Sequence, residues 1–133
     1  MNHDDLQGWL DRYVAAWRAN DAGPIEDLFT DDAVYLHHPY DVGSRALLGR
    51  ESIVANWLDK PDDPDAWEAS YRPYAIDGDR AVAVGWSRYL AKGDQPEETF
   101  HNVYLLRFAS DGRCSEFTEY YVLEPSREKA DSA

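Results

Sequence analysis

The 133-residue sequence has a single cysteine, Cys114, and no second thiol with which it could form an internal disulfide. No stretch approaches the ~20 apolar residues that span a bilayer, and the first residues lack the basic and apolar segments of a secretory signal. Basic residues are scarce, since 13 Lys and Arg stand against 26 Asp and Glu, for a formal net charge of -13. We therefore expect a cytoplasmic protein that binds neither membranes nor nucleic acid, because it would repel their phosphates.

Signatures of cofactor and metal sites are missing as well. The sequence has no glycine-rich phosphate loop, no Gly-x-Ser-x-Gly motif and no Cys-His nucleophile pattern. The adjacent His37 and His38 are too closely spaced to chelate a metal from a strand. We expect no metal and no cofactor, which leaves acid-base chemistry by side chains.

Aromatic residues, in contrast, are abundant, with five Trp, nine Tyr and four Phe. Large rings fill protein cores and also line ligand pockets. At this length a hydrophobic content of 44% is enough for one core without disulfides or a metal. We expect one domain over residues 1–124, followed by a flexible polar tail over residues 125–133.

The first half of the sequence predicts three helices and one short strand. Apolar residues recur at helical spacing over residues 6–17, and Pro24 can stand in the first turn of a second, short helix. Gly49 opens a third helix that ends before Pro61. Between the second and third helices, residues 33–38 are rich in β-prone types and stop at a proline, which indicates a short strand.

The second half of the sequence has a residue pattern typical of β-strands. Strands are predicted near residues 67–76, 80–91, 99–109 and 113–123. Turn pairs such as Asp77-Gly78 and Asp111-Gly112 join them into an antiparallel meander. Amphipathic helices must bury their apolar stripes on such a sheet. The predicted fold class is α+β, with three N-terminal helices packed on a strongly bent antiparallel sheet.

The two-residue alternation of strands predicts which side chains share a face. We expect three rows on the helix side: Val82, Val84, Trp86, Arg88 and Leu90; Phe100, Asn102, Tyr104, Leu106 and Phe108; and Phe117, Glu119, Tyr121 and Leu123. Arg88, Asn102 and Glu119 interrupt rows that are otherwise apolar. A buried carboxylate is costly unless it is paired or protonated, so Glu119 is either a functional group or the partner of Arg88 in a structural salt bridge.

Five segments of the sequence resemble the nuclear transport factor two-like superfamily. They are DRYVAAW at 11–17, IEDLFTDDA at 25–33, LGRESI at 48–53, RFASDGR at 107–113 and EYY at 119–121. The sequence is similar in particular to SnoaL-like polyketide cyclases and ketosteroid-isomerase-like proteins. This resemblance implies a cone-shaped α+β barrel, commonly dimeric, with a pocket for a small apolar organic ligand between the helices and the concave sheet.

The resemblance also implies roles for three residues. Tyr13 matches the tyrosine of the first helix that donates a hydrogen bond to an oxyanion in ketosteroid isomerases. His38 stands where those enzymes have their Asp base, and Tyr104 stands where they have a protonated Asp in the oxyanion hole. Two of the three positions therefore depart from the isomerase pattern, which argues against steroid isomerisation by that mechanism.

These arguments define the candidate site. The catalytic candidates are His38, Tyr13, Glu119 and Tyr104. His37 and His38 would point to opposite faces of a strand, and the position before proline favours His38 for the pocket. Either histidine could instead make only a structural hydrogen bond. The candidates for substrate binding are Asn102, Arg88, His37, Tyr35, Trp17, Trp57, Trp86, Phe117 and Tyr121.

The pattern favours a cofactor-independent acid-base enzyme, namely an isomerase, cyclase or dehydratase that acts on a small hydrophobic carbonyl compound. One alternative is a binding domain that holds a small molecule without catalysis. Another is an epoxide hydrolase of the limonene-epoxide-hydrolase type, although only one carboxylate of its carboxylate-arginine-carboxylate set is evident. A protein-interaction scaffold of the nuclear transport type is a third. We expect a homodimer that binds a small apolar ligand.

Overall fold

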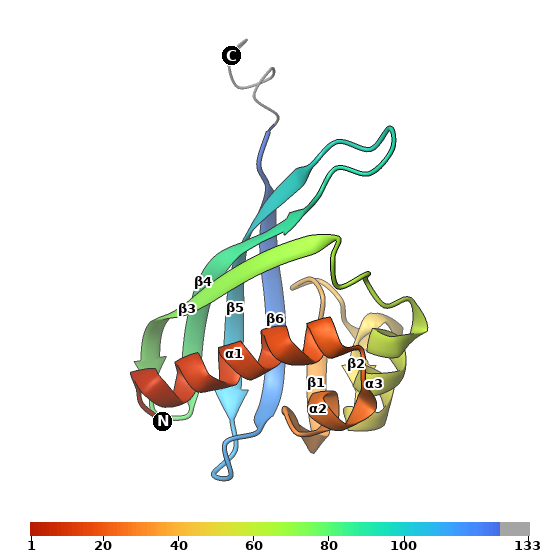
Figure 1. Ribbon diagram of the computed structural model, residues 1–133. Coiled ribbons are helices and arrows are strands. Elements are labelled where there is room, and N and C mark those ends of the chain that lie inside the picture. The colour runs from red at the N-terminus through yellow and green to blue at the C-terminus, as the bar shows by residue number, and fades with distance from the viewer. Residues whose placement is uncertain (126–133) are drawn as a thin grey trace.

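The computed structural model describes residues 1–125, which form three α-helices and a six-stranded sheet (Figure 1). The helices are α1 (His3–Ala19), α2 (Ala22–Glu26) and α3 (Arg50–Asp59). Most of the predicted polar tail, residues 126–133, lies outside the described residues. Within residues 1–125 no helix is long and apolar enough to cross a membrane.

Helix α1 follows from the local sequence. The Asn2 side chain accepts a hydrogen bond from the Asp5 backbone N–H, and the Asp5 carboxylate accepts one from the Asn2 backbone, so the helix starts with a complete capping box. It ends at Asn20, whose φ of 51° is left-handed. Its buried face consists of Leu6, Trp9, Leu10, Tyr13 and Ala16. The predicted amphipathic helix is therefore confirmed and begins slightly earlier than its apolar stripe.

The sheet has the strand order β2-β1-β6-β5-β4-β3. Its strands are β1 (Phe29–Leu36), β2 (Leu47–Leu48), β3 (Trp67–Asp77), β4 (Arg80–Tyr89), β5 (Glu98–Phe108) and β6 (Cys114–Leu123). The predicted antiparallel meander is confirmed for β3 to β6. The predicted α+β fold class is confirmed, with one difference from the expected antiparallel sheet, namely that β1 pairs with β6 in parallel. That pairing begins where the Cys114 N–H donates to the Leu28 carbonyl, a long-range contact that no local pattern encodes.

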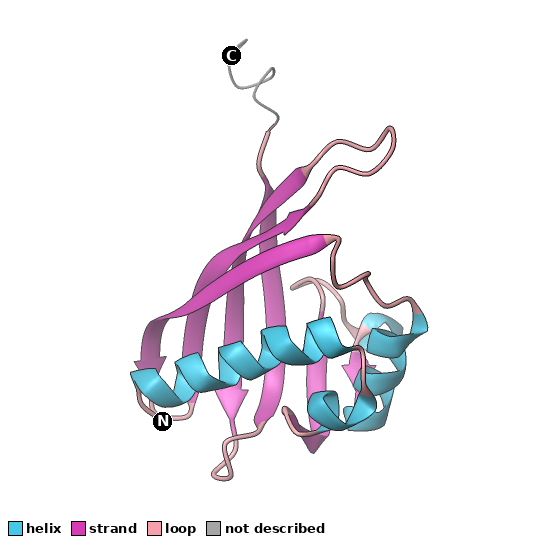
Figure 2. Cartoon of the chain, viewed as in Figure 1, coloured by secondary structure: helices cyan, strands magenta, loops and turns pink. Residues whose placement is uncertain are grey.

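The helices cover one face of the sheet. Figure 2 shows α1 lying across the strands, with α2 and α3 beside β1 and β2. Trp9 of α1 stands at the centre of the core, within 6.5 Å, ring centroid to centroid, of Tyr13, Phe29, Phe108 and Phe117. Its indole N–H donates to the Leu28 carbonyl at 3.1 Å, so this large ring is buried with its polar atom paired.

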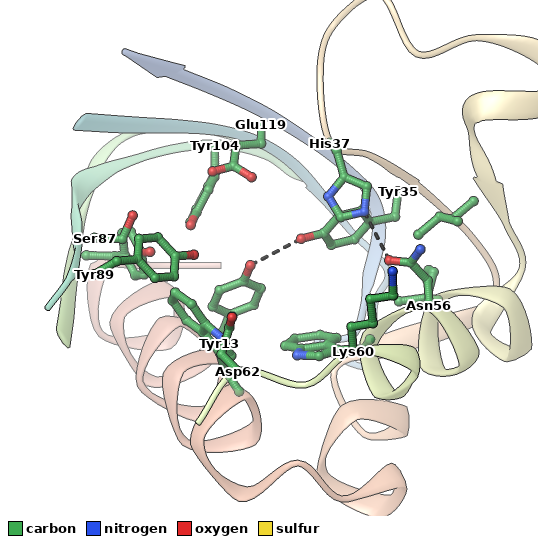
Figure 3. Close-up of a pocket in the computed structure, with 15 residues that line it drawn as sticks. Tyr13, Tyr35, His37, Asn56, Lys60, Asp62, Ser87, Tyr89, Tyr104 and Glu119 are labelled. Carbon is green, nitrogen blue, oxygen red and sulfur yellow. Dashed lines mark hydrogen bonds between the residues drawn. The ribbon is translucent and has the colours of Figure 1, made fainter. Parts of the chain in front are cut away.

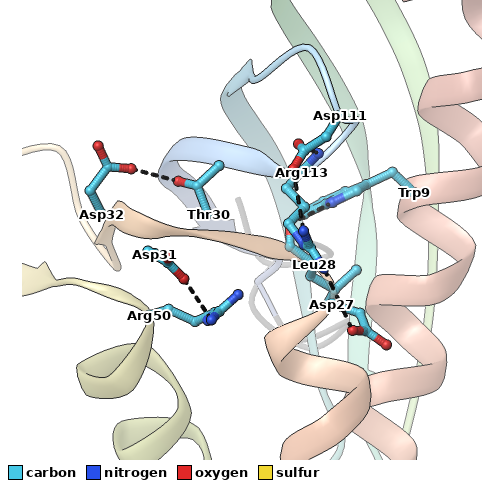
Figure 4. A network of polar contacts seen from close by, with 9 residues as sticks. All are labelled: Trp9, Asp27, Leu28, Thr30, Asp31, Asp32, Arg50, Asp111 and Arg113. Atoms are coloured by element: carbon cyan, nitrogen blue, oxygen red, sulfur yellow. Dashed lines mark hydrogen bonds and ion pairs between the residues drawn. The ribbon is translucent and has the colours of Figure 1, made fainter.

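Polar contacts fix the start of β1 to its neighbours (Figure 4). Arg50 of α3 lies 2.6 Å from the Asp31 carboxylate, and Arg113, just before β6, approaches Asp27 and Asp111 at 4.0 and 3.3 Å. These pairs are mostly exposed, so each contributes little to stability. They join α3, β1 and the β5–β6 turn on the outside of the aromatic core.

The faces of β4 differ from the prediction. Val82, Val84, Trp86 and Arg88 lie on the outer face, and the inner positions are Ala81, Ala83, Gly85, Ser87 and Tyr89. At Gly85 the paired strand β3 comes so close that no side chain fits on the inner face. A Cβ at position 85 would lie 2.1 Å from the Ser70 carbonyl oxygen. Hydrophobicity alone placed the large side chains inward, which was wrong for this strand, whereas the inner rows of β5 and β6 agree with the prediction.

Candidate functional site

A cavity of about 230 Å³ opens between α1, α3 and the inner face of the sheet (Figure 3). Seven of its lining residues are aromatic: Tyr13, Trp17, Tyr35, Trp57, Tyr71, Tyr89 and Tyr104. Its polar lining residues are His37, Asn56, Lys60, Asp62, Ser87 and Glu119. A cavity of ~150 Å³ is enough to hold benzene, so this one fits a molecule of about one substituted ring.

Phenol hydroxyls gather inside this cavity. Figure 3 shows the hydroxyls of Tyr13, Tyr35 and Tyr104 pointing into the same space as the carboxyl of Glu119. The hydroxyls of Tyr13 and Tyr35 are 3.2 Å apart and share a hydrogen bond. Burial raises the pKa of Tyr13, Tyr35 and Tyr104 well above the ordinary value, and that of Tyr71 to about 12. The phenols therefore stay neutral and can donate hydrogen bonds.

Glu119 projects from β6 into the same space. Its Oε2 accepts a hydrogen bond of 2.7 Å from Asn102 Nδ2, and the Asn102 Oδ1 accepts one of 3.1 Å from the Ser87 hydroxyl. Burial raises the pKa of Glu119 to about 7, against the lowering effects of the Asn102 hydrogen bond and the nearby His38. At neutral pH this carboxyl can therefore both give and take a proton.

A second cavity of about 430 Å³ adjoins the first. The two share four lining residues, namely Asp62, Ser87, Tyr89 and Glu119. The second is also lined by Glu98, Phe100, Asn102 and Tyr121. Because Glu119 faces both spaces, one ligand could extend past its carboxyl from one cavity into the other.

The two histidines are arranged differently from the expectation. His37 lines the first cavity, with its Nε2 3.1 Å from the Asn56 Oδ1, in the same alternation as the inward Tyr35. His38 lies outside that cavity, where Nδ1 is 2.9 Å from the Asp41 carboxylate and Nε2 is 2.9 Å from the Tyr121 hydroxyl. The alternation of side chains that continues from β1 thus turns His37 inward. The position of His38 before proline does not turn it into the cavity.

Most of the predicted site residues come together around the two cavities. Tyr13, Trp17, Tyr35, His37, Trp57, Tyr104 and Glu119 line the first cavity, and Asn102 and Tyr121 line the second. Phe117 is part of the core and packs behind two lining residues. Its ring centroid lies 4.2 Å from that of Tyr35 and 5.6 Å from that of Tyr13, and the rings are stacked.

Two predicted site residues lie elsewhere. Trp86 and Arg88 stand together on the outer face, with the Arg88 guanidinium 4.8 Å from the Trp86 ring centroid. Arg88 also approaches Glu68 at 3.7 Å and Glu97 at 4.0 Å. The salt bridge with Arg88, one of the two explanations of Glu119 that the sequence left open, is therefore not formed, and Glu119 instead accepts a hydrogen bond from Asn102.

Sequence reasoning missed several lining residues. Ser87 and Tyr89 would have been predicted if the opposite set of alternate residues of β4 had been assigned to the inner face. Ser87 is the polar residue in that row. Asp62 lies in a loop without periodicity and accepts a hydrogen bond of 2.9 Å from the Trp17 indole. Asp41 is also in a loop, and only its contact with His38 reveals it. Among residues 1–125 no three His, Cys, Asp or Glu side chains gather closely enough to hold a metal ion.

The comparisons with known proteins agree with this architecture. One similar structure is a hypothetical protein with a ketosteroid isomerase-like fold from Catenulispora acidiphila DSM 44928, solved in complex with trimethylamine. Its sequence is 20% identical, the TM-score is 0.62, and the match covers 85% of this chain and 84% of that one. An LEH-like epoxide hydrolase from M. tuberculosis is 13% identical with a TM-score of 0.63, covering 90% and 84%.

At these identities the two structures show a shared fold and no shared activity. No similarity to a curated protein was found. Residues 10–117 match the family described as the SnoaL-like domain, which agrees with the resemblance seen in the sequence. Because this match covers most of the chain, the protein belongs to the SnoaL-like domain family.

Proposed function

We propose that this protein is a cofactor-independent acid-base enzyme that moves a proton on a small hydrophobic carbonyl compound, as an isomerase, cyclase or dehydratase does. The observation behind the proposal is the Glu119 carboxyl, which faces both cavities and whose pKa burial raises to about 7. A general acid or base is most effective when its pKa lies near the working pH. Asn102 holds this carboxyl in place at 2.7 Å.

The buried phenols supply the second element of such a site, because proton removal next to a carbonyl leaves negative charge on the oxygen. Tyr13 and Tyr35 share one hydrogen bond, so one of the two hydroxyls keeps its proton free for a ligand. Tyr104 points its hydroxyl into the same space. Neutral donors fixed in a poorly solvated cavity stabilise an oxyanion without having to reorganise.

Proton exchange next to a carbonyl gives a test that needs no known substrate. Small cyclic ketones are incubated with the protein in D₂O, and NMR follows both their binding and the incorporation of deuterium beside the carbonyl. We expect exchange above the buffer rate, and a loss of about 10²–10⁴-fold in Glu119→Gln. Glu116→Gln is the matched control, because Glu116 is an exposed residue of the same strand that pairs with Arg107.

Exchange at the wild-type rate in Glu119→Gln would contradict the proposal. So would an absence of exchange for ketones that NMR shows to bind beside Tyr13 and Tyr104.

A second candidate function is the binding of a small amine without catalysis. Aromatic faces attract cations, and the first cavity combines seven aromatic residues with the carboxyl groups of Asp62 and Glu119. The trimethylamine complex of the similar Catenulispora acidiphila protein supports this alternative. Titration with trimethylamine decides it. Binding that Trp57→Ala abolishes, in a protein that exchanges no ketone proton, would favour this function over the enzyme.

Epoxide hydrolysis of the limonene-epoxide-hydrolase type gains no support from the site. That chemistry uses a carboxylate-arginine-carboxylate set, and Arg88 lies on the outer face. No arginine of residues 1–125 lines either cavity. The similarity to an LEH-like epoxide hydrolase thus concerns the fold alone.

The proposed enzyme is a cytoplasmic homodimer that pairs through the outer face of the sheet. Val103, Leu105, Tyr120 and Val122 are 36%, 42%, 43% and 69% exposed on that face, and apolar patches of this kind mark interaction surfaces. Sedimentation would show a dimer for the wild type and a monomer for Val122→Lys. A wild-type monomer at micromolar concentration would contradict the assembly.

A further inference from the structure

Three side chains beside the second cavity form a hydrogen-bonded triad, Asp41–His38–Tyr121. The Asp41 Oδ2 lies 2.9 Å from the His38 Nδ1, and the His38 Nε2 lies 2.9 Å from the Tyr121 hydroxyl. Asp41 is buried, with 7% of its surface exposed, and the Tyr40 ring stacks on the imidazole at 5.0 Å with only 7° between the planes. The imidazole is therefore held at both nitrogens and on one face.

The triad determines where the protons lie. A carboxylate can only accept, so the His38 Nδ1 donates its proton to Asp41. In the tautomer with its proton on Nδ1, the His38 Nε2 is an acceptor to which the Tyr121 hydroxyl can donate. A phenol that donates to an imidazole backed by a carboxylate is activated toward losing its proton.

Tyr121 also lies in the right place to meet a ligand. It follows Glu119 by two residues on the inner face of β6, and both residues line the second cavity with Asn102. Once protonated, His38 is close enough to Glu119 to lower the pKa of that carboxyl. An acid-base group and a phenol backed by a histidine therefore face one space.

We propose that the Asp41–His38–Tyr121 triad is a second acid-base centre of this site. Tyr121 is its catalytic residue and contacts the substrate, His38 takes and returns the phenol proton, and Asp41 is a positioning residue that fixes the imidazole. The proposal rests on the proposed function, because the triad supplies the base that works opposite the acid Glu119. The substrate is a carbonyl compound whose oxygen lies among the phenols of the first cavity and whose α-carbon reaches the second.

The proton balance of an enolisation is then complete without a co-reactant. The substrate C–H proton passes to the Tyr121 oxygen as the phenol proton passes to the His38 Nε2, and the C–H electron pair forms the new C=C bond. The Glu119 carboxyl gives its proton to the carbonyl oxygen. The site is left with an imidazolium beside Asp41 and a Glu119 carboxylate, and proton transfer through solvent from the first to the second restores it. The other acidic groups that line this space are Asp62 and Glu98.

A chemical probe of base catalysis tests the triad. In 5-nitrobenzisoxazole, removal of the C–H proton by a base breaks the N–O bond and gives a coloured cyanophenolate. We expect the rate to fall about 10²-fold in Tyr121→Phe and about tenfold in Asp41→Asn. The matched controls are Tyr74→Phe and Asp77→Asn in β3, both exposed, and both should keep the wild-type rate.

The tautomer of His38 gives a readout of the positioning role. Long-range ¹H–¹⁵N NMR of the imidazole should show a proton on Nδ1 in the wild type and in Tyr121→Phe. Asp41→Asn should shift the population toward the Nε2 proton. A wild-type imidazole protonated at Nε2 alone would overturn the triad.

The outcomes separate this proposal from the proposed function. The triad is overturned if Tyr121→Phe and Asp41→Asn keep the wild-type elimination rate while Glu119→Gln loses it. That result leaves the role of Glu119 standing. Loss in Tyr121→Phe and Asp41→Asn with an unchanged rate in Glu119→Gln overturns the role of Glu119 and supports the triad. No elimination above the buffer rate in a wild-type protein that NMR shows to bind 5-nitrobenzisoxazole overturns the triad, whereas ketone exchange decides the role of Glu119 separately.

Discussion

The two faces of the sheet come from the same strands and differ in what they hold. The inner face combines small residues such as Ala83 and Gly85 with polar groups such as the buried Asn102 and the half-buried Glu119. The outer face has larger apolar side chains, among them Val103 and Val122, together with ion pairs. Apolar side chains cover much of any protein surface, so the informative feature is the buried polar group. In this molecule Asn102 and Glu119 mark the side of the cavities, whereas Arg88 lies on the outer face.

The largest expected difference between the faces concerns two tyrosines. Tyr104→Phe removes a hydroxyl that points into the first cavity, and we expect ketone proton exchange to fall about 10²–10³-fold. Tyr120→Phe makes the same change on the outer face and should leave the rate unaltered. The rate is measured by NMR in D₂O. Equal rates for the two variants would remove the functional distinction between the faces.

The next effect concerns stability and a pair of glycines. Gly85→Ala places a Cβ 2.1 Å from the Ser70 carbonyl oxygen, and the strain should lower the free energy of unfolding by about 2–3 kcal/mol. At Gly8, within α1, a Cβ would have no neighbouring atom within 4 Å. Gly8→Ala should therefore raise the free energy of unfolding by about 0.5–1 kcal/mol. Urea titration measures both. An unchanged free energy of unfolding in Gly85→Ala would show that β3 does not approach Gly85 as closely as described.

The pH dependence of stability sharpens the comparison further. Since the pKa of Glu119 is raised in the folded protein, the folded state binds this proton more tightly than the unfolded chain does. Its contribution to stability is therefore full below about pH 4.5 and is lost as the pH rises to about 7. Across that range we expect Glu119→Gln to gain about 2 kcal/mol relative to the wild type. Parallel stability curves for the two proteins would contradict the burial of this carboxyl.

The smallest effect is expected for the outer tryptophan. Trp86→Ala should leave ligand affinity within about twofold, because the Trp86 ring lies beside Arg88 on the outer face. Trp57→Ala removes a ring from the wall of the first cavity and should weaken binding about tenfold. Calorimetry with a ketone that binds the wild type compares the two. A greater loss in Trp86→Ala than in Trp57→Ala would reverse the assignment of the faces.

Much of the fold could be predicted from local pattern. The apolar spacing from Leu6 to Trp17 gave α1, and the turn pairs placed β3 to β6 within about two residues of their observed ends. The two-residue alternation of strands gave the inner rows of β5 and β6, which include Asn102 and Glu119. The family resemblance added Tyr13, which lines the first cavity.

The remaining features depend on contacts that are distant in sequence. The phase of β4 is set by how closely β3 approaches Gly85, and the parallel pairing of β1 depends on the contact between Leu28 and Cys114. His38 links Asp41 to Tyr121, a residue that is distant in the sequence, through one hydrogen bond to each. Each of these required the packed structure, because neither periodicity nor propensity encodes which strands become neighbours.

The central claim is that Glu119, half-buried beside both cavities, is a proton donor and acceptor at neutral pH. Its most direct test is a ¹³C NMR titration of the glutamate side-chain carboxyls, with the Glu119 signal assigned by its loss in Glu119→Gln. Burial in the cavity predicts a midpoint near pH 7 for this signal. A midpoint near the ordinary value of 4.5 would contradict the account, because the carboxyl would then be solvated and ionised at neutral pH.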